Sequence, residues 1–220
     1  MSFPFKVALM FTALATLTIF GILYFTAPYQ PSTDIKPQTQ KEQPEPLFGS
    51  DTLMISHLTP DDGNLANLFD VNWRGQTFTT VGAFTVTSIK IIFGAETGTA
   101  PDVTATINTT SASEPTTTIL ATATKSVNAG TEEFIFSVPA ALSATTMYAI
   151  VLSMPAGDGS NRIALKGSIP SDTYTDGTYS ASADSGANWS NGTTEDLLFE
   201  VYGTTGAGAS TINPDTIIFE

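Results

Sequence analysis

The sequence predicts an all-β domain, an antiparallel β-sandwich, preceded by an N-terminal membrane segment and a proline-rich linker. Three observations support this prediction. Within residues 51–203, short runs alternate apolar and polar side chains with the period of two that half-buried strands require. Clusters of Gly, Pro, Asn, Asp and Ser separate these runs, and none of the runs has a helical period. Only 13% of the residues are charged, whereas Thr, Ser, Ala and Gly are abundant, which suits short strands joined by tight turns.

The first element is an apolar segment, VALMFTALATLTIFGILYF, at residues 7–25. As a helix it would be about 28 Å long, close to the roughly 30 Å of a bilayer's hydrocarbon core. We expect an uncleaved signal anchor, because a cut after Ala27 would place the bulky Phe25 at the −3 position. Lys6 and the amino terminus precede the segment, which favours a cytoplasmic stub within residues 1–26 and an exported C-terminal part.

A type IV pilin leader is the alternative for this segment. Such leaders place a glycine directly before the apolar helix and a glutamate early within it. The sequence MSFPFKVALM has neither feature, so a standard pilin is disfavoured.

The second element is a linker at residues 27–50, rich in proline and glutamine. This composition favours an extended spacer with little apolar periodicity. We expect it to hold the folded domain away from the bilayer.

The third element is the sandwich domain, residues 51–203. In EFIFSV (133–138) the alternation predicts Phe134, Phe136 and Val138 on one face. MYAIVL (147–152) is apolar on both faces and predicts a central strand. The other alternating runs are SIKIIF (88–93), VTATI (103–107) and LLFEVY (197–202).

Composition excludes several classes of function. The formal charge is −13, the isoelectric point is near 4.2, and the eight Lys and Arg residues are scattered. A nucleic-acid partner is therefore not expected, because binding to a phosphate backbone needs clustered cations. The absence of cysteine excludes disulfides, thiol catalysis and thiolate-bound zinc.

Several segments in sequence order resemble a known family. They are RGQTFTT (74–80), AFTVTSIKIIF (83–93), TILATATKS (118–126), the stretch from Val138 to Asn161, TYSASADSGANWS (178–190) and DLLFEVYG (196–203). This order resembles extracellular β-sandwich domains of the choice-of-anchor type, which are jelly-roll-like modules of bacterial and archaeal surface proteins. The resemblance implies a jelly-roll-like sandwich displayed on a surface, with no agreed ligand. This chain departs from the family by having its membrane segment at the N-terminus, where the family usually has a C-terminal anchor.

One short motif, SADSGANWS, is similar to the Asp-box of sialidases and other β-propellers. Ser182, Asp184, Gly186 and Trp189 have the spacing S-x-D-x-G-x-x-W. A propeller repeats the motif once per blade, and here it occurs once. We therefore interpret it as a structural hairpin in which Asp184 accepts backbone N–H groups, Gly186 has a positive φ and Trp189 folds over the turn.

Two kinds of binding site are candidates. Aromatic residues near predicted turns could form a platform on which sugar rings stack. The alternative is that they pack at the ends of the core. These residues are Trp73, Tyr174, Tyr179 and Trp189. Side-chain oxygens in acidic turns could bind a calcium ion. The alternative is that these turns are exposed to solvent and bind no ion. The candidate ligands are Asp158, Asn161 and Asp184.

Catalysis is not expected. His57 is the single histidine and has no recognisable nucleophile beside it. Arg74 and Arg162 are the two arginines, too few for the three-arginine clamp that a sialidase would need.

The last element is the flexible tail, residues 204–220, which ends in the strand-like TIIFE. This segment either closes the domain's own sheet or pairs with the sheet edge of a neighbouring subunit. We expect a membrane-anchored extracellular protein with a structural, adhesive or glycan-binding display role and no enzymatic activity. The alternative is a subunit of a surface filament, layer or virion shell, in which like subunits exchange this terminal strand.

Overall fold

The computed structural model describes residues 51–169 and 174–206, which lie in one compact unit of the chain, Pro46–Glu220. These residues form strands and turns without a helix, so they hold no helix able to span a membrane. The predicted membrane segment (7–25), the linker (27–50) and most of the tail lie outside the described residues. The strands are β1 (Thr52–His57), β2 (Asn64–Leu68), β3 (Trp73–Thr79), β4 (Phe84–Thr97), β5 (Val103–Ser111), β6 (Glu114–Lys125), β7 (Gly130–Leu142), β8 (Met147–Ser153), β9 (Arg162–Ser168), β10 (Tyr179–Ser182), β11 (Ser190–Asn191), β12 (Asp196–Leu197) and β13 (Phe199–Thr204).

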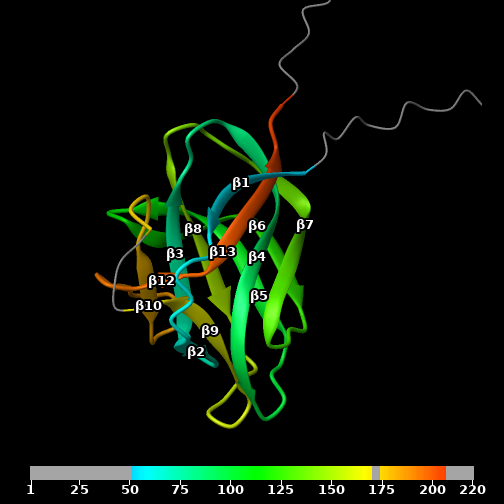
Figure 1. Ribbon diagram of the computed structural model, residues 1–220, viewed down its shortest axis with the longest axis vertical. Helices are drawn as coiled ribbons and strands as arrows, with labels where there is room; N and C mark the ends of the chain where they lie inside the picture. Colours follow the sequence, from blue (N-terminus) through cyan, green and yellow to red (C-terminus); the bar gives the residue numbers. More distant parts are fainter. Residues whose placement is uncertain (1–50, 170–173, 207–220) are drawn as a thin grey trace, which may run out of the picture. The chain divides into compact units, whose positions relative to one another are not determined.

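The strands build two antiparallel sheets. The first sheet has the strand order β1-β13-β4-β9-β12. In addition, β2 pairs with β9, and β7 pairs with β4. Figure 1 shows β13 between β1 and β4 in this sheet. The 14-residue β4 holds the sheet together: its residue Ile91 pairs with Phe199 of β13, and Phe93 pairs with Leu165 of β9. Strands β13 and β9 therefore follow one another along the same edge of β4.

The second sheet has six strands in the order β11-β10-β3-β8-β5-β6. Strand β8 lies between β3 and β5, which confirms the central strand that its two apolar faces predict. The β5–β6 connection is a two-residue turn in which Ala112 and Ser113 have φ values of 51° and 64°. Positive φ at both central residues is the geometry of a type I′ hairpin.

The core lies between the two sheets. Phe78 of β3 faces Phe199 of β13 with ring centroids 6.4 Å apart, and both side chains are fully buried. Alternate residues of β4, β5 and β8 complete the core, as the period of two requires. The all-β class and the antiparallel sheets are thus as predicted.

One predicted alternation is wrong at its end. Phe134 and Phe136 of β7 are buried, but Val138 is 72% exposed. The β4–β7 register shifts between the pairs Val86–Ala140 and Ser88–Ile135, so β7 contains extra residues at this point. Such a bulge reverses the phase of the side chains, and Val138 points away from the core.

Candidate functional site

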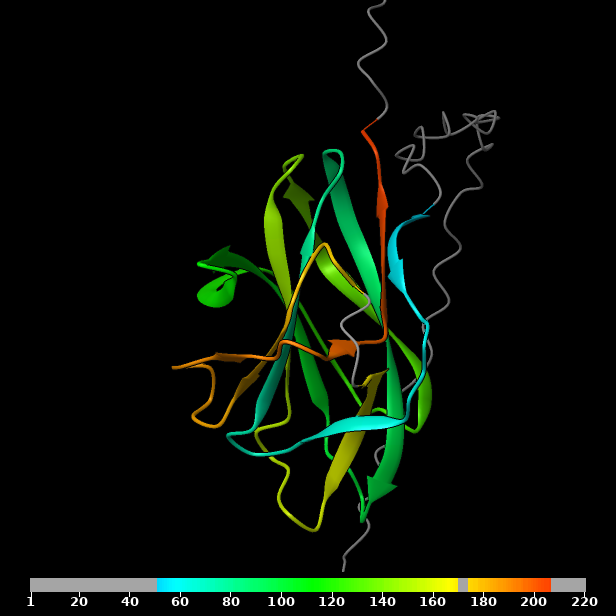
Figure 2. The same ribbon diagram turned by 60° about the vertical axis from the view of Figure 1, so that its left-hand side comes forward.

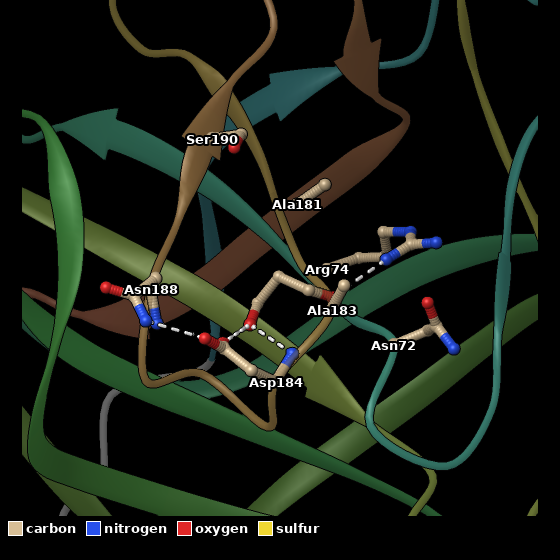
Figure 3. A pocket seen from close by; sticks show the side chains of 8 residues that line it. Asn72, Arg74, Ala181, Ala183, Asp184, Asn188 and Ser190 are labelled. Atoms are coloured by element: carbon tan, nitrogen blue, oxygen red, sulfur yellow. Dashed lines mark hydrogen bonds between the residues drawn. The ribbon is translucent and has the colours of Figure 1, made fainter.

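The hairpin between β10 and β11 is built around Asp184. The Asn188 backbone N–H donates to Asp184 Oδ1 at 2.9 Å, and the Asn188 side-chain amide donates to Oδ2 at 2.6 Å. The Ser182 hydroxyl donates to Oδ1 at 2.7 Å and accepts the Gly186 N–H at 2.9 Å. Figure 3 shows the bond from the Asn188 side chain to Asp184. These bonds, with those from Asn188 first, lower the pKa of Asp184 to about 2, so its carboxylate is ionised at neutral pH.

The turn itself needs a small residue. Ser185 and Gly186 have φ values of 60° and 80°. A Cβ added at Gly186 would lie 2.8 Å from Trp73 Cε3 and 3.5 Å from the Trp189 ring. The two tryptophans therefore pack on the same glycine, one from the start of β3 and one from the hairpin.

A groove of about 290 Å³ lies beside these tryptophans, on the outer face of the six-stranded sheet. Its floor comes from alternate residues of β5 and β8 whose neighbours point into the core. The hairpin supplies one wall, and the β6 residues after the β5–β6 turn supply the other; both hairpins stand out on the left in Figure 2. The lining residues are Trp73, Thr104, Thr106, Asn108, Thr116, Thr117, Ile119, Thr122, Val151, Ser153, Ser185, Gly186 and Trp189.

Hydrogen bonds order the polar floor of the groove. The Thr106 hydroxyl donates to Asn108 Oδ1 at 2.5 Å, and Asn108 Nδ2 donates to the Thr116 carbonyl at 2.8 Å. The amide of Asn108 is therefore held in one orientation between β5 and β6. The sequence reveals the alternating threonines of residues 103–107 as a polar strand face, but not that this face is the floor of a groove.

A second pocket of about 390 Å³ lies on the other side of the hairpin residues. It is lined by Asn72, Arg74, Ala181, Ser182, Ala183, Asp184, Asn188 and Ser190, most of which Figure 3 labels. Arg74 Nη1 donates to the Trp73 carbonyl at 2.7 Å and to the Ser182 carbonyl at 3.3 Å. These bonds fix the guanidinium to the base of the hairpin.

The structure brings together two of the four aromatic residues predicted as a platform. Trp73 and Trp189 line the groove, whereas Tyr174 and Tyr179 are buried elsewhere. The Tyr174 ring packs at 5.2 Å from the Phe199 ring and 5.4 Å from the His57 ring. Burial raises the pKa of Tyr179 to about 12, as expected for an interior phenol. The two tyrosines therefore belong to the core, although they lie on either side of a turn.

The predicted calcium ligands lie in two different turns. Asp158 Oδ1 accepts the backbone N–H groups of Ser160 and Asn161, at 2.6 and 2.8 Å. The bond from Ser160 is the main cause of the lowered pKa of Asp158. Asn161 directs its Nδ2 toward Asp158 and uses its Oδ1 to accept the Thr99 N–H. Asp184 lies in the hairpin, and residues 51–169 and 174–206 contain no cluster of three acidic or histidine residues suited to a metal.

His57 is a packing residue with a polar contact. It is 7% exposed, and its Nε2 lies 3.4 Å from the Ser168 hydroxyl. Nearby, the fully buried Asp196 accepts Gln76 Nε2 at 3.1 Å and the Tyr174 backbone N–H at 3.0 Å. This network joins β3 of one sheet to β12 of the other. The sequence does not reveal this network, because Gln76 and Asp196 are 120 positions apart.

The fold and site define a β-sandwich with a surface groove of aromatic, hydroxyl and amide side chains. No family model matches the sequence, and no curated protein matches it.

Proposed function

We propose that this protein is a membrane-anchored, exported display protein whose groove beside Trp73 and Trp189 binds glycans without cleaving them. The observation that carries the proposal is the combination of two tryptophans with a hydrogen-bonded polar floor in a single groove. Sugar rings present apolar C–H faces that pack on aromatic rings, and hydroxyl groups that bond to Thr, Ser and Asn. Largely pre-formed clefts with a few placed polar groups are typical of ligand sites.

The chemistry of the lining favours binding over hydrolysis. The groove is lined by hydroxyl, amide and apolar side chains, none of which exchanges a proton near neutral pH. Hydrolysis of a glycosidic bond usually uses a pair of carboxyl groups that flank the bond. An adhesive or display role needs affinity and access alone, which a surface groove provides.

Features of the sequence support the anchored topology and surface display. Residues 7–25 are apolar and uncharged, Lys6 precedes them, and residues 27–50 have the composition of a spacer. The strand order along the sequence resembles the choice-of-anchor type of surface domain, with its jelly-roll-like connections. We therefore propose that residues 7–25 form a helix across the membrane and that the sandwich is a jelly-roll-like domain outside it.

A glycan array tests the groove. We expect the full chain in detergent micelles to bind at least one glycan class, and Trp189→Ala to weaken that binding at least tenfold. Thr122→Val removes one hydroxyl from the groove, and Thr118→Val is its matched control, because Thr118 lies on the same strand outside the lining. Equal binding by the Trp189→Ala and native chains would exclude the groove, and hydrolysis of a bound glycan would contradict the non-catalytic assignment.

A second candidate function is self-assembly through the tail, and an apolar end of the sandwich favours it. Val81 is 90% exposed there, beside a pocket of about 200 Å³ lined by Met54, Ile55, Phe84 and Thr205 among others. The tail leaves the described structure at Gly206, which lines a further small pocket against Leu142. The apolar TIIFE segment of a second copy is a suitable occupant for this end.

Size-exclusion chromatography with light scattering tests assembly. If strand exchange operates, the full chain in detergent forms oligomers that dissociate when residues 207–220 are deleted. An unchanged mass after the deletion would exclude the tail as the assembling element. Val81→Asp provides an independent variant, since it places a charge at the apolar end without changing the tail.

A further inference from the structure

The pocket on the Arg74 side of the hairpin has the chemistry of a carboxylate site. Arg74 Nη1 donates to two backbone carbonyls and its Nε is buried, so Nη2 is the terminal nitrogen left to meet a ligand. The cations Lys125 and Lys166 pair with carboxylates at 2.6 and 3.3 Å. Arg74 forms no such ion pair with any of the described residues. It is thus an oriented guanidinium whose charge no carboxylate neutralises.

The rest of the lining adds neutral polar groups. Asn72 and Ser190 contribute an amide and a hydroxyl, and the Asn72 side chain makes no hydrogen bond to the described residues. Figure 3 shows Asn72 and Arg74 on the same side of the hairpin residues. A volume of about 390 Å³ lies within the roughly 300–1,000 Å³ range that is common for small-ligand sites.

Charge limits what this pocket can hold. Asp184 is ionised and also lines the pocket, and the chain carries a formal charge of −13. The Asp184 carboxylate and the net negative charge of the chain would repel a ligand with several negative charges. The single positive charge of Arg74 can balance one carboxylate. A guanidinium N–H forms a charge-assisted hydrogen bond with a carboxylate, which is stronger than a hydrogen bond between neutral groups.

We propose that this pocket binds the carboxylate of a single acidic sugar residue, such as a uronic acid, within the glycan held in the tryptophan groove. The inference rests on the proposed function, because the hairpin forms a wall of both sites. Trp73 and Arg74 are consecutive, as are Asn188 and Trp189, and in each pair one residue lines the pocket and the other the groove. A glycan that crosses the hairpin would contact both sites.

Calorimetry with a matched pair of ligands tests the inference. The probes are a glucuronic-acid-terminated oligosaccharide and its carboxyl-reduced, glucose-terminated form, titrated into the full chain in detergent micelles. We expect the native chain to bind the acidic form about tenfold more tightly, the usual order for one charge-assisted hydrogen-bonded pair. Arg74→Gln should abolish the preference. Arg162→Gln, which changes the other arginine, should retain the preference.

A second variant guards against an effect on folding, since Arg74 also bonds to the hairpin backbone. Asn72→Asp is isosteric, leaves the backbone bonds of Arg74 in place and adds a negative charge to the pocket. It should remove the preference for the acidic form, and retention of the preference in Asn72→Asp would overturn the inference.

The two proposals fail in different ways. If the native chain bound both probes equally, the carboxylate site would be overturned. If Trp189→Ala then abolished this binding, the groove would still be supported. Failure of the native chain to bind either probe would count against both sites.

Discussion

At the scale of single residues, the hairpin depends on two positions whose roles differ. Asp184 supplies acceptors for the donors of Ser182 and Asn188, and Gly186 supplies a backbone conformation and space. Both roles belong to the local chain, which is why a nine-residue motif was sufficient to predict them. The position of Trp73 against Gly186 is different, because it depends on a strand more than 100 residues away.

The first prediction concerns pH. The folded-state pKa of Asp184 is lowered from its ordinary value of 3.8 to about 2. Its ionised form therefore stabilises the fold above pH 4, and this contribution is lost as the pH falls through 4 toward 2. We expect the melting temperature of the native chain to exceed that of Asp184→Asn at pH 6, and most of this difference to be lost by pH 2.

Asn188→Ala is the informative partner variant, because bonds from Asn188 contribute most to lowering the Asp184 pKa. In that background the effect of Asp184→Asn at pH 6 should be smaller. A difference between native and Asp184→Asn that is constant from pH 6 to pH 2 would show that the carboxylate charge has no such role.

The second prediction concerns Gly186. Alanine here would have to adopt a φ of 80° and would place its Cβ 2.8 Å from the Trp73 ring. The left-handed conformation alone costs about 1–2 kcal/mol, so we expect Gly186→Ala to lower the free energy of unfolding by about 2 kcal/mol. Tryptophan fluorescence during urea denaturation measures this change, since both tryptophans of the chain pack on this glycine.

Gly82→Ala is the matched control, because a Cβ at that position would meet no atom within 4 Å and φ is not positive. Its effect should lie within about 0.5 kcal/mol. If the two alanine variants were equally stable, the close packing of Trp73 on the turn would be contradicted.

At the scale of elements, the strands show which sequence patterns are reliable. Period-two alternation places the core residues of β4, β5 and β13 correctly, because each strand has one face on the core. It fails in β7, where the shift of register against β4 moves Val138 to the surface. A bulge depends on the partner strand, so alternation within one strand does not reveal it.

The third prediction tests this register. Phe136 is 3% exposed and Val138 is 72% exposed, although they are two residues apart. Phe136→Ala should lower the free energy of unfolding by about 3–5 kcal/mol, as for other large-to-small core changes. Val138→Ala should change it by less than about 0.5 kcal/mol. Comparable losses from both substitutions in chemical denaturation would mean that β7 keeps its alternation and has no bulge.

The candidate groove combines predictable and unpredictable parts at the same scale. Trp189 follows from the hairpin motif, and the threonines of β5 follow from alternation. The sequence does not show that Trp189 lies beside these threonines, because this requires the strand order β10-β3-β8-β5 within one sheet. Tyr179 illustrates the same limit, since its place in the core is fixed by pairing with Gln76 of β3.

At the scale of the whole molecule, the two sheets are joined by more than apolar packing. Gln76 is fully buried in β3, where its Nε2 donates to Asp196 Oδ1 and its Oε1 accepts the Leu197 N–H at 2.9 Å. Asp196 and Leu197 form β12 of the opposite sheet. A buried amide that satisfies both a carboxylate and a backbone donor fixes how one sheet lies over the other.

The fourth prediction follows from this link. Gln76→Leu has a similar volume but leaves the Leu197 N–H without its acceptor and removes one donor from Asp196. Leaving buried polar groups unsatisfied costs about 1–3 kcal/mol each, so we expect a loss of about 2–4 kcal/mol in the free energy of unfolding. Gln76→Glu tests the electrostatic part, because it keeps an acceptor for Leu197 but places a second carboxylate against Asp196. Its loss should be larger at pH 7 than at pH 4, since protonation relieves the repulsion. Losses below 0.5 kcal/mol for Gln76→Leu would mean that apolar packing alone sets the arrangement of the sheets.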